Sequence, residues 1–348
     1  MFGRMMNSFY YGKSGKGDFR REDLPKNRMQ LFREMLRVRI SALFRLNLMC
    51  VVAFLPLIIV FAQGIMTLIS GMNGFYDYDQ AVLAGDLSAF TEEQIKVYSS
   101  FTFNDLVKNV LFSSCLWLIP CILITGPVQV GMAYVTRNWA RDEHAFIWSD
   151  FKDAVKENWK QALGVSAITS VLPIILYVCW NFYGQMANEN MFFIVPQVLT
   201  VSLGLVWALG MTFMYPMMVS YKMTFREIVK NGILLAIARL PQTVGIRLAL
   251  LVLIAVCVVV LMFTSVGMYA LLILAAYYIL VGYAFSRFVI ASYTNAVFDK
   301  FINSHIEGAQ VNRGLSKDED EEDEEEGTPD EAGDEKPAEA PEGQPAHA

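Results

Sequence analysis

The sequence predicts an all-α, polytopic membrane protein with six transmembrane helices, and three observations support this prediction. The 348 residues are 55% hydrophobic, with a mean hydropathy of +0.38, whereas apolar residues make up about 45–50% of a typical soluble domain. These residues are gathered into six long stretches, each long enough to cross a bilayer as a helix. A six-residue pattern also recurs three times, always shortly before an odd-numbered stretch.

The recurring pattern reads aromatic, basic, acidic, any residue, aliphatic, basic, and its copies begin at Phe32, Phe151 and Phe225. Each copy lies in an amphipathic run with an apolar side and a basic side. These runs cover residues 31–42, 148–160 and 223–232. Because such helices bury their apolar side among lipid headgroups, we expect each to be a short helix lying flat on the inner membrane surface. A helix packed against the bundle is the alternative.

The second run shows the two sides most clearly. Trp148 and Phe151 belong to one apolar stripe, while the lysines at 152, 156 and 160 form a separate row at a spacing of four residues. With a transmembrane hairpin after each run, the chain becomes three parallel repeats of an interfacial helix and a hairpin.

Charge divides the chain into three regions. The total is −6, but from Ser316 onward fifteen acids face two lysines, which gives −13 there and leaves +7 for the rest. We therefore predict a basic N-terminal arm (1–30), a membrane domain (31–303) and an acidic tail (304–348). The tail has too little apolar surface to offset the entropy of ordering it, so we expect it to be disordered.

The first two spans are predicted at residues 43–70 and 110–136. Asn47 lies near the start of the first span, and Pro56 in its middle removes a backbone donor and should kink the helix. The polar loop between these spans, 71–109, is rich in acidic and aromatic residues. Such residues form either a packed cap with an interfacial belt or a sugar-binding surface.

Within this loop, Thr91 and Gln94 have the spacing of a capping box. The sequence therefore predicts a short helix from Glu92 to about Ser99.

The remaining spans are predicted at residues 161–183, 192–219, 244–263 and 268–290. Pro173 lies in a Leu-Pro-Ile-Ile sequence that echoes the Leu-Pro-Leu-Ile around Pro56, at a similar distance from its amphipathic run. A proline also lies close to the inner end of the second span and of the fourth. These positions are Gly126 with Pro127, and Tyr215 with Pro216.

Lysine and arginine counts near the span ends predict the orientation. The N-terminal segment and the loops 137–160 and 220–243 are basic, whereas the loop 71–109 is acidic. The loops 184–191 and 264–267 contain neither lysine nor arginine. Because basic loops stay on the cytoplasmic side, we expect both termini in the cytoplasm.

The spans offer little that resembles catalytic chemistry. Arg247 and Arg287 lie near inner ends, where we expect them to extend toward water. The other polar side chains in the spans are predicted to hydrogen bond between helices, with a path for a neutral solute as the alternative. These are Asn47, Gln63, Gln129, Asn181 and Gln197. We find no nucleophile–base pair, phosphate-binding loop or metal cluster, and so predict a protein that is not an enzyme, has no cofactor and binds no nucleic acid.

Several of these positions together resemble the YesL-like family of bacterial integral membrane proteins. The resemblance rests on Asn47-Leu48 with Pro56, Gly126-Pro127 with Thr136-Arg137, Trp148 to Phe151, Tyr215-Pro216 and Leu240-Pro241. It implies a multi-pass protein of the bacterial plasma membrane whose function is undefined. Family members are often encoded near carbohydrate uptake systems of the ABC type, which implies permease subunits as partners beside the lipid bilayer.

Two functional classes therefore remain. The first is a non-catalytic membrane protein that is accessory to carbohydrate uptake or use and docks on a permease through its basic inner face. The second is a transporter or channel for an uncharged small solute such as a sugar.

Overall fold

The computed structural model describes residues 25–264 and 266–315, and within these ranges the chain is helical and contains no strand. The first hairpin consists of α2 (Arg28–Ala84), α3 (Glu92–Ser100) and α4 (Phe103–Ala140). The second consists of α5 (Ser149–Glu189), the short η2 (Met191–Phe193) and α6 (Ile194–Ser220). After α7 (Phe225–Ala238), the third consists of α8 (Leu240–Phe263), α9 (Gly267–Tyr277), a π-helical turn η3 (Tyr278–Gly282) and α10 (Tyr283–Phe301), which η4 (Asn303–His305) follows.

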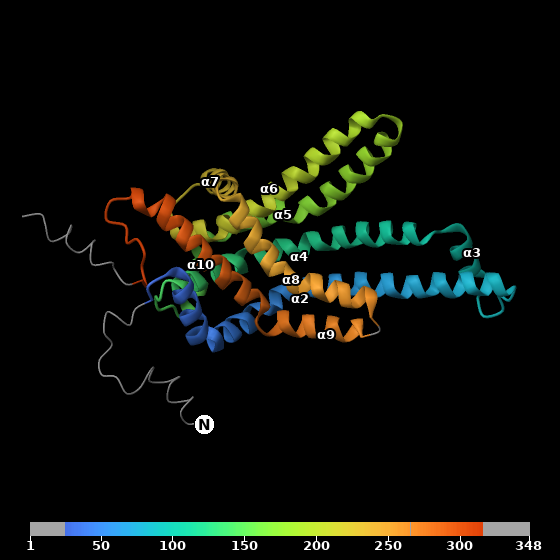
Figure 1. Ribbon diagram of the computed structural model, residues 1–348, viewed down its shortest axis with the longest axis horizontal. Helices are drawn as coiled ribbons and strands as arrows, with labels where there is room; N and C mark the ends of the chain where they lie inside the picture. Colours follow the sequence, from blue (N-terminus) through green and yellow to red (C-terminus); the bar gives the residue numbers. More distant parts are fainter. Residues whose placement is uncertain (1–24, 265, 316–348) are drawn as a thin grey trace, which may run out of the picture.

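Six helical segments in the described part of the chain are long and apolar enough to cross a membrane, which confirms the predicted number. Figure 1 shows all three hairpin turns on the right and both ends of the described chain on the left. The three hairpins therefore point the same way, as parallel repeats require. We call the left end, which holds the three amphipathic runs, the basic end, and the opposite end the tip end.

The amphipathic runs differ from the prediction in their continuity. The first two runs continue without a break into α2 and α5, and only the third is a separate helix, α7. No helix-breaking residue separates either of the first two runs from its span. By contrast, α7 begins at a capping box of Thr224 and Glu227 and ends before Pro241.

Part of the apolar side of each run faces the protein, whereas Trp148 and Trp159 of the second run are 66% and 44% exposed. A Cβ atom at Gly131 would lie 2.5 Å from the ring of Phe151, and one at Gly164 would lie 2.8 Å from the ring of Phe225. Phe32 stacks on Phe288 with ring centroids 5.5 Å apart. All three aromatic positions of the repeat therefore have a packing partner in the bundle.

The segment predicted as the loop 71–109 is mostly helical. At about 1.5 Å per residue, the 57 residues of α2 extend roughly 85 Å, nearly three times the hydrocarbon thickness of a bilayer. The helix α3 and its capping box match the prediction. The ring centroid of Tyr98 lies 4.9 Å from that of Phe75, 5.3 Å from that of Tyr78 and 6.0 Å from that of Phe90. These aromatic residues thus pack as a cap on the hairpin.

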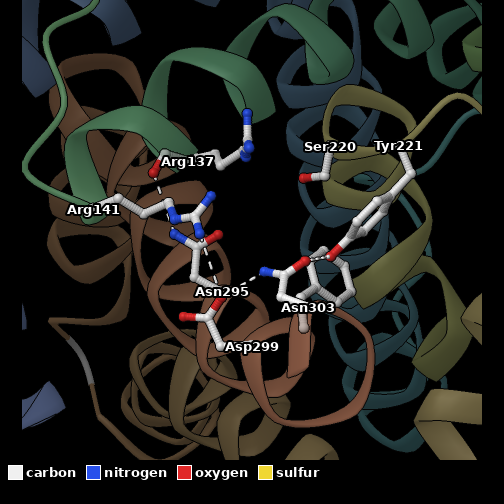
Figure 2. A pocket seen from close by; sticks show the side chains of 8 residues that line it. Arg137, Arg141, Ser220, Tyr221, Asn295, Asp299 and Asn303 are labelled. Atoms are coloured by element: carbon white, nitrogen blue, oxygen red, sulfur yellow. Dashed lines mark hydrogen bonds and ion pairs between the residues drawn. The ribbon is translucent and has the colours of Figure 1, made fainter. Parts of the chain in front are cut away.

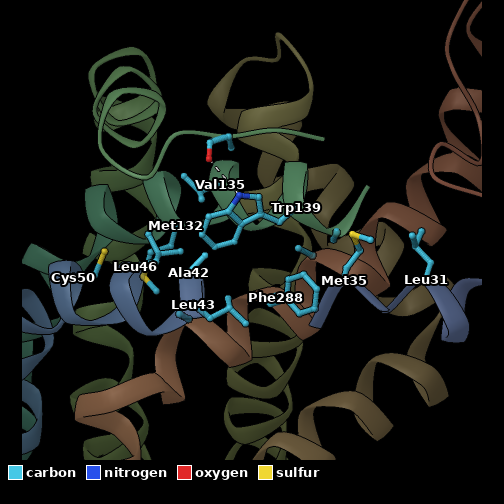
Figure 3. Packing of buried hydrophobic residues seen from close by; sticks show 14 of the residues in the cluster. Leu31, Met35, Ala42, Leu43, Leu46, Cys50, Met132, Val135, Trp139 and Phe288 are labelled. Carbon is cyan, nitrogen blue, oxygen red and sulfur yellow. Dashed lines mark hydrogen bonds between the residues drawn. The ribbon is translucent and has the colours of Figure 1, made fainter. Parts of the chain in front are cut away.

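Buried side chains are concentrated toward the basic end. In α2 they stop at Phe54, in α5 they stop at Ser170, and in α6 they begin only at Gly204. Figure 3 shows the largest cluster, in which Trp139 of α4 lies among side chains of α2 and Phe288 of α10. Figure 1 shows α5 and α6 leaning away from α2 and α4 toward the tips. The hairpins are therefore joined at the basic end and diverge toward the tips.

The chain remains packed beyond the predicted start of the tail. Leu315 contacts the cluster around Trp139, and Arg313 pairs with Glu143 at 3.2 Å. Residues 304–315 contain only one acid, Glu307, and four apolar residues, Ile306, Ala309, Val311 and Leu315, which explains why they dock where the acidic sequence that follows was expected not to. The predictions for residues 1–24 and 316–348 lie outside the described residues.

Candidate functional site

A cavity of about 500 Å³ lies where the three hairpins meet. The first hairpin contributes residues of α2 and α4, the second residues of α5 and α6, and the third residues of α8, η3 and α10. The lining includes Phe54, Leu57, Ile122, Thr125, Gln129, Thr169, Leu205, Leu209, Arg247, Leu251, Tyr278, Tyr283, Ser286 and Arg287. Its volume lies within the roughly 300–1,000 Å³ of small-molecule sites. The cavity is therefore the best-formed candidate site in the described part of the chain.

Two arginines line this cavity. The guanidinium of Arg287 on α10 donates to Oε1 of Gln129 on α4, and it lies over the ring of Tyr215, 5.3 Å from the centroid. The guanidinium of Arg247 on α8 donates to Oγ1 of Thr212 at 2.8 Å and to the carbonyl of Ala208 at 3.2 Å. Each arginine therefore binds polar groups of a neighbouring hairpin.

This placement differs from the prediction that both arginines extend toward water. On insertion scales, an arginine costs roughly 2.5–3.5 kcal/mol at the centre of a spanning helix and less toward its ends. Among residues 25–264 and 266–315, none of the ion pairs involves Arg247 or Arg287. Such side chains are rare inside membranes and usually mark a ligand or ion pathway, so these two arginines are the strongest functional candidates in the fold.

The cavity is polar toward the basic end and apolar toward the tips. On α4, Ile122 lies seven residues, or about 10 Å, closer to the tip than Gln129. On α8, Leu251 lies about 6 Å closer to the tip than Arg247. The two arginines and Gln129 thus lie toward the basic end of the space, and the tip end is mostly apolar, apart from Tyr278 and Tyr283.

Asn47 holds the part of the cavity wall that η3 and the start of α10 form. Its amide nitrogen donates to the carbonyls of Tyr278 and Ile279 at 2.9 and 2.8 Å, and its amide oxygen accepts from the backbone nitrogen of Ala284 at 2.9 Å. Those groups belong to the π-helical turn η3 and its exit, where the regular α-helical hydrogen bonds are interrupted. Single π-turns of this kind are frequent at functional sites. Asn47 therefore makes the interhelical bond that was predicted and positions Tyr278, Tyr283 and Arg287.

The other polar side chains of the spans differ in whether they hydrogen bond to another helix or within their own helix. Gln129 bonds to Arg287 and to Thr125, and Gln197 donates to the carbonyl of Trp180 on the neighbouring α5. Asn181, by contrast, bonds within its own helix to the carbonyl of Tyr177 at 2.8 Å. The expected interhelical role therefore holds for Asn47, Gln129 and Gln197.

Of the remaining predicted site residues, Tyr215 contacts the cavity arginine Arg287. Gly126 allows α4 and α5 to approach closely, since a Cβ atom there would lie 2.7 Å from the carbonyl oxygen of Ala162. Trp148 is 66% exposed at the basic end. The prolines lie within helices that continue past them, and these are Pro56, Pro127, Pro173 and Pro216.

A second polar cluster, around Asp299, closes the basic end (Figure 2). The buried carboxylate of Asp299 accepts from Arg28 at 2.5 Å, Arg141 at 3.3 Å and Asn303 at 2.6 Å. The backbone nitrogen of Asn312 donates to it at 3.3 Å. One carboxylate thus connects the start of α2, the end of α4 and the end of α10 with the segment that follows α10.

Arg137 and Tyr221 line the small cavity of about 60 Å³ beside this carboxylate. Burial, and then the negative charge of Asp299, raises the pKa of the Tyr221 hydroxyl to about 12. The hydroxyl is therefore protonated at neutral pH, and it donates to Oδ1 of Asn303 at 2.7 Å. A space of this size holds water molecules rather than an organic ligand. The Asp299 cluster is therefore structural, and it connects the helix ends at the basic end.

Neither the buried ion pairs of Asp299 nor the meeting of Arg247 and Arg287 in one cavity was predicted from the sequence. Asp299 is the only acid between Met268, where the last span was predicted to begin, and Ile306, and such a charge needs a partner when it is buried. That signal was available in the sequence. The meeting of Arg247 and Arg287 was not, because they lie on different helices and nothing in their spacing indicates contact.

Comparison with known families supports only a coarse statement. Residues 106–180 match the model of a family described as a protein of unknown function, DUF624. The match covers α4 and α5 over most of their apolar length, including the cavity residues Ile122, Thr125, Gln129 and Thr169. Neither a curated protein nor a solved structure shows significant similarity to the chain. Together with the six apolar helices, the match indicates a membrane protein of unknown function.

Proposed function

We propose that the chain is a non-catalytic, YesL-like protein of the bacterial plasma membrane that is accessory to carbohydrate uptake. In this proposal its basic end faces the cytoplasm and holds a subunit of an ABC-type permease. The family resemblance supplies the link to carbohydrate uptake. The surface of the basic end supplies the means of docking.

The observation that carries this proposal is that each amphipathic run buries apolar residues in the bundle and exposes basic residues at its surface. Their apolar residues Met35, Ala154 and Ile228 are buried in the bundle. Their basic residues are exposed, namely Arg33, Arg37, Lys152, Lys156, Lys160, Arg226 and Lys230. The exposed basic residues give each run a side that is complementary in charge to an acidic partner surface.

Co-purification from native membranes tests the proposal. The tagged full-length protein should retain permease subunits, identified by mass spectrometry. Replacing Lys152, Lys156 and Lys160 by glutamine should release them, and the loss should follow the salt dependence of a charged interface. The matched control replaces Lys96 and Lys108 at the tip end, which should leave the complex intact. Retention of the same subunits by the triple lysine variant would show that the basic end is not the docking surface.

Reconstitution separates this proposal from transport of an uncharged solute. The purified protein alone in lipid vesicles should move no labelled sugar. Sugar uptake by the protein alone would overturn the accessory role and favour transport through the central cavity.

A further inference from the structure

We propose that the central cavity binds an anionic amphiphile, meaning a carboxylate or phosphate group carried on a hydrocarbon chain. The anionic group would lie between Arg247 and Arg287, and the chain would lie along the apolar walls toward the tips. This site is distinct from the basic docking surface and does not depend on the accessory role.

Unbalanced positive charge is the first argument. Arg247 and Arg287 line one cavity, and no carboxylate in the described part of the chain pairs with either of them. Nη1 of Arg287 is buried and has no hydrogen-bond partner among the described residues. Buried charges in proteins are normally paired and fully hydrogen-bonded. An oxyanion in the cavity supplies both the missing charge and an acceptor for this donor.

The polarity of the walls indicates what the anion is attached to. Beyond the arginines and Gln129, most of the lining surface is apolar, with side chains such as Leu57, Ile122 and Leu251, and the remaining polar groups are the hydroxyls of Thr125, Thr169, Tyr278, Tyr283 and Ser286. A small hydrophilic anion would leave this surface wet, whereas a hydrocarbon chain would cover it. Ile122, Leu205 and Leu251 lie on the tip side of the arginines, whereas Leu209 lies level with Arg247. An amphiphile with its head toward the basic end therefore matches the cavity along its length.

The cavity also has an opening that suits a ligand from the bilayer. Leu205 on α6 and Leu251 on α8 line the cavity and are nevertheless 58% and 51% exposed. The space is therefore open to the surface between these two helices, within the apolar belt of the molecule. A membrane-dissolved amphiphile can enter there without passing through water.

The receptor groups are held in place before any ligand binds. Gln129 is oriented by its bond to Thr125 at 2.9 Å, and Arg247 is oriented by its two bonds to α6. The three bonds of Asn47 hold η3 and thereby the helix that carries Arg287. Because these side chains are already ordered, binding requires little further loss of conformational entropy.

A titration of the full-length protein in a neutral maltoside detergent tests the site, with thermal unfolding and native mass spectrometry as readouts. Three probes separate head from tail: dodecyl phosphate, dodecanol and inorganic phosphate. Dodecyl phosphate should bind and raise Tm. Dodecanol and inorganic phosphate should each bind at least roughly tenfold more weakly, since each lacks one half of the recognised chemistry.

Variants locate the binding. Arg247→Gln and Arg287→Gln should each weaken dodecyl phosphate binding by roughly tenfold or more, whereas Arg45→Gln, an exposed arginine outside the cavity, should not. Leu251→Trp keeps both arginines and fills the opening, so it should reduce binding even if an arginine variant fails to fold. The site would be overturned if both Arg→Gln variants bound dodecyl phosphate as tightly as the wild type does. The same conclusion would follow if Leu251→Trp bound it as tightly as the wild type does. Equal binding of inorganic phosphate would replace the amphiphile with a free anion, and equal binding of dodecanol would remove the role of charge.

Discussion

Replacing Asp299 by asparagine should destabilise the protein more than any other single change of charge at the basic end. The carboxylate is 3% exposed and faces two arginine side chains, Arg141 at 10% and Arg28 at 28% exposure. Asparagine has nearly the same shape but no charge. The substitution therefore leaves the guanidinium of Arg141 buried without its counter-ion and also replaces acceptor atoms that Arg28 and Asn303 use.

The size of the effect follows from the burial of the two partners. Removing one member of a buried ion pair typically costs about 3–5 kcal/mol. Arg28 is partly exposed, and solvent screens its share of the interaction, so we expect about 3 kcal/mol. For a chain of this size that corresponds to a fall in Tm of roughly 6 °C.

Thermal unfolding in detergent, followed by tryptophan fluorescence, measures this effect. Asp153→Asn is the matched control, because Asp153 is an exposed acid at the same end of the bundle, and it should change Tm by little. Arg141→Gln should also destabilise. The double variant Asp299→Asn with Arg141→Gln should be more stable than the sum of the two losses implies, with a coupling of about 1–3 kcal/mol. A loss below about 1 kcal/mol for Asp299→Asn would mean that the Asp299 cluster does not join the helices as described.

Three further predictions concern other parts of the chain. Cysteine at Ser88 should react with a membrane-impermeant reagent from outside intact cells and cysteine at Ser149 should not, and the reverse pattern would contradict cytoplasmic termini. Truncation after Leu315 should leave Tm unchanged, whereas truncation after Gly308 should lower it, because residues 310–315 supply contacts to Arg141, Asp299 and Glu143. Phe151→Asp should destabilise the protein by about 3 kcal/mol or more, since the ring packs on Gly131 of α4. Lys152→Gln should have almost no effect, and equal Tm values for the two variants would refute this packing.

The spans and caps could be predicted from the sequence because their causes are local. A long apolar run must be helical in a bilayer, where each backbone group needs a partner within its own segment. The capping box at Thr91 likewise depends on two residues three positions apart. The amphipathic runs were also found correctly. Which of their apolar residues pack on a neighbouring helix could not be predicted, because an apolar stripe fits a lipid headgroup region and a neighbouring helix equally well.

The contacts that distinguish the candidate sites lie beyond such local reasoning. Asn47 reaches η3 across 231 positions of sequence, and Arg287 reaches Gln129 across 158. Asparagine near a span start predicts an interhelical bond but not its partner. The π-helical turn is similarly absent from the pattern around Tyr278, and the side chain that binds its carbonyls, Asn47, lies on another helix. Tertiary packing thus decides which polar residues of the spans are structural and which line the cavity.

The position of the cavity follows from how the three hairpins are joined. Buried packing holds them together at the basic end, where the Asp299 cluster and the side chains around Trp139 tie α2, α4 and α10 to one another. Toward the tips, buried residues become rare and α5 and α6 lean away (Figure 1). A space must therefore open where the joined part ends, and Arg247 and Arg287 lie at that boundary. Because each hairpin supplies part of the wall, a ligand bound there contacts all three, and its binding free energy adds to the free energy that keeps the hairpins together.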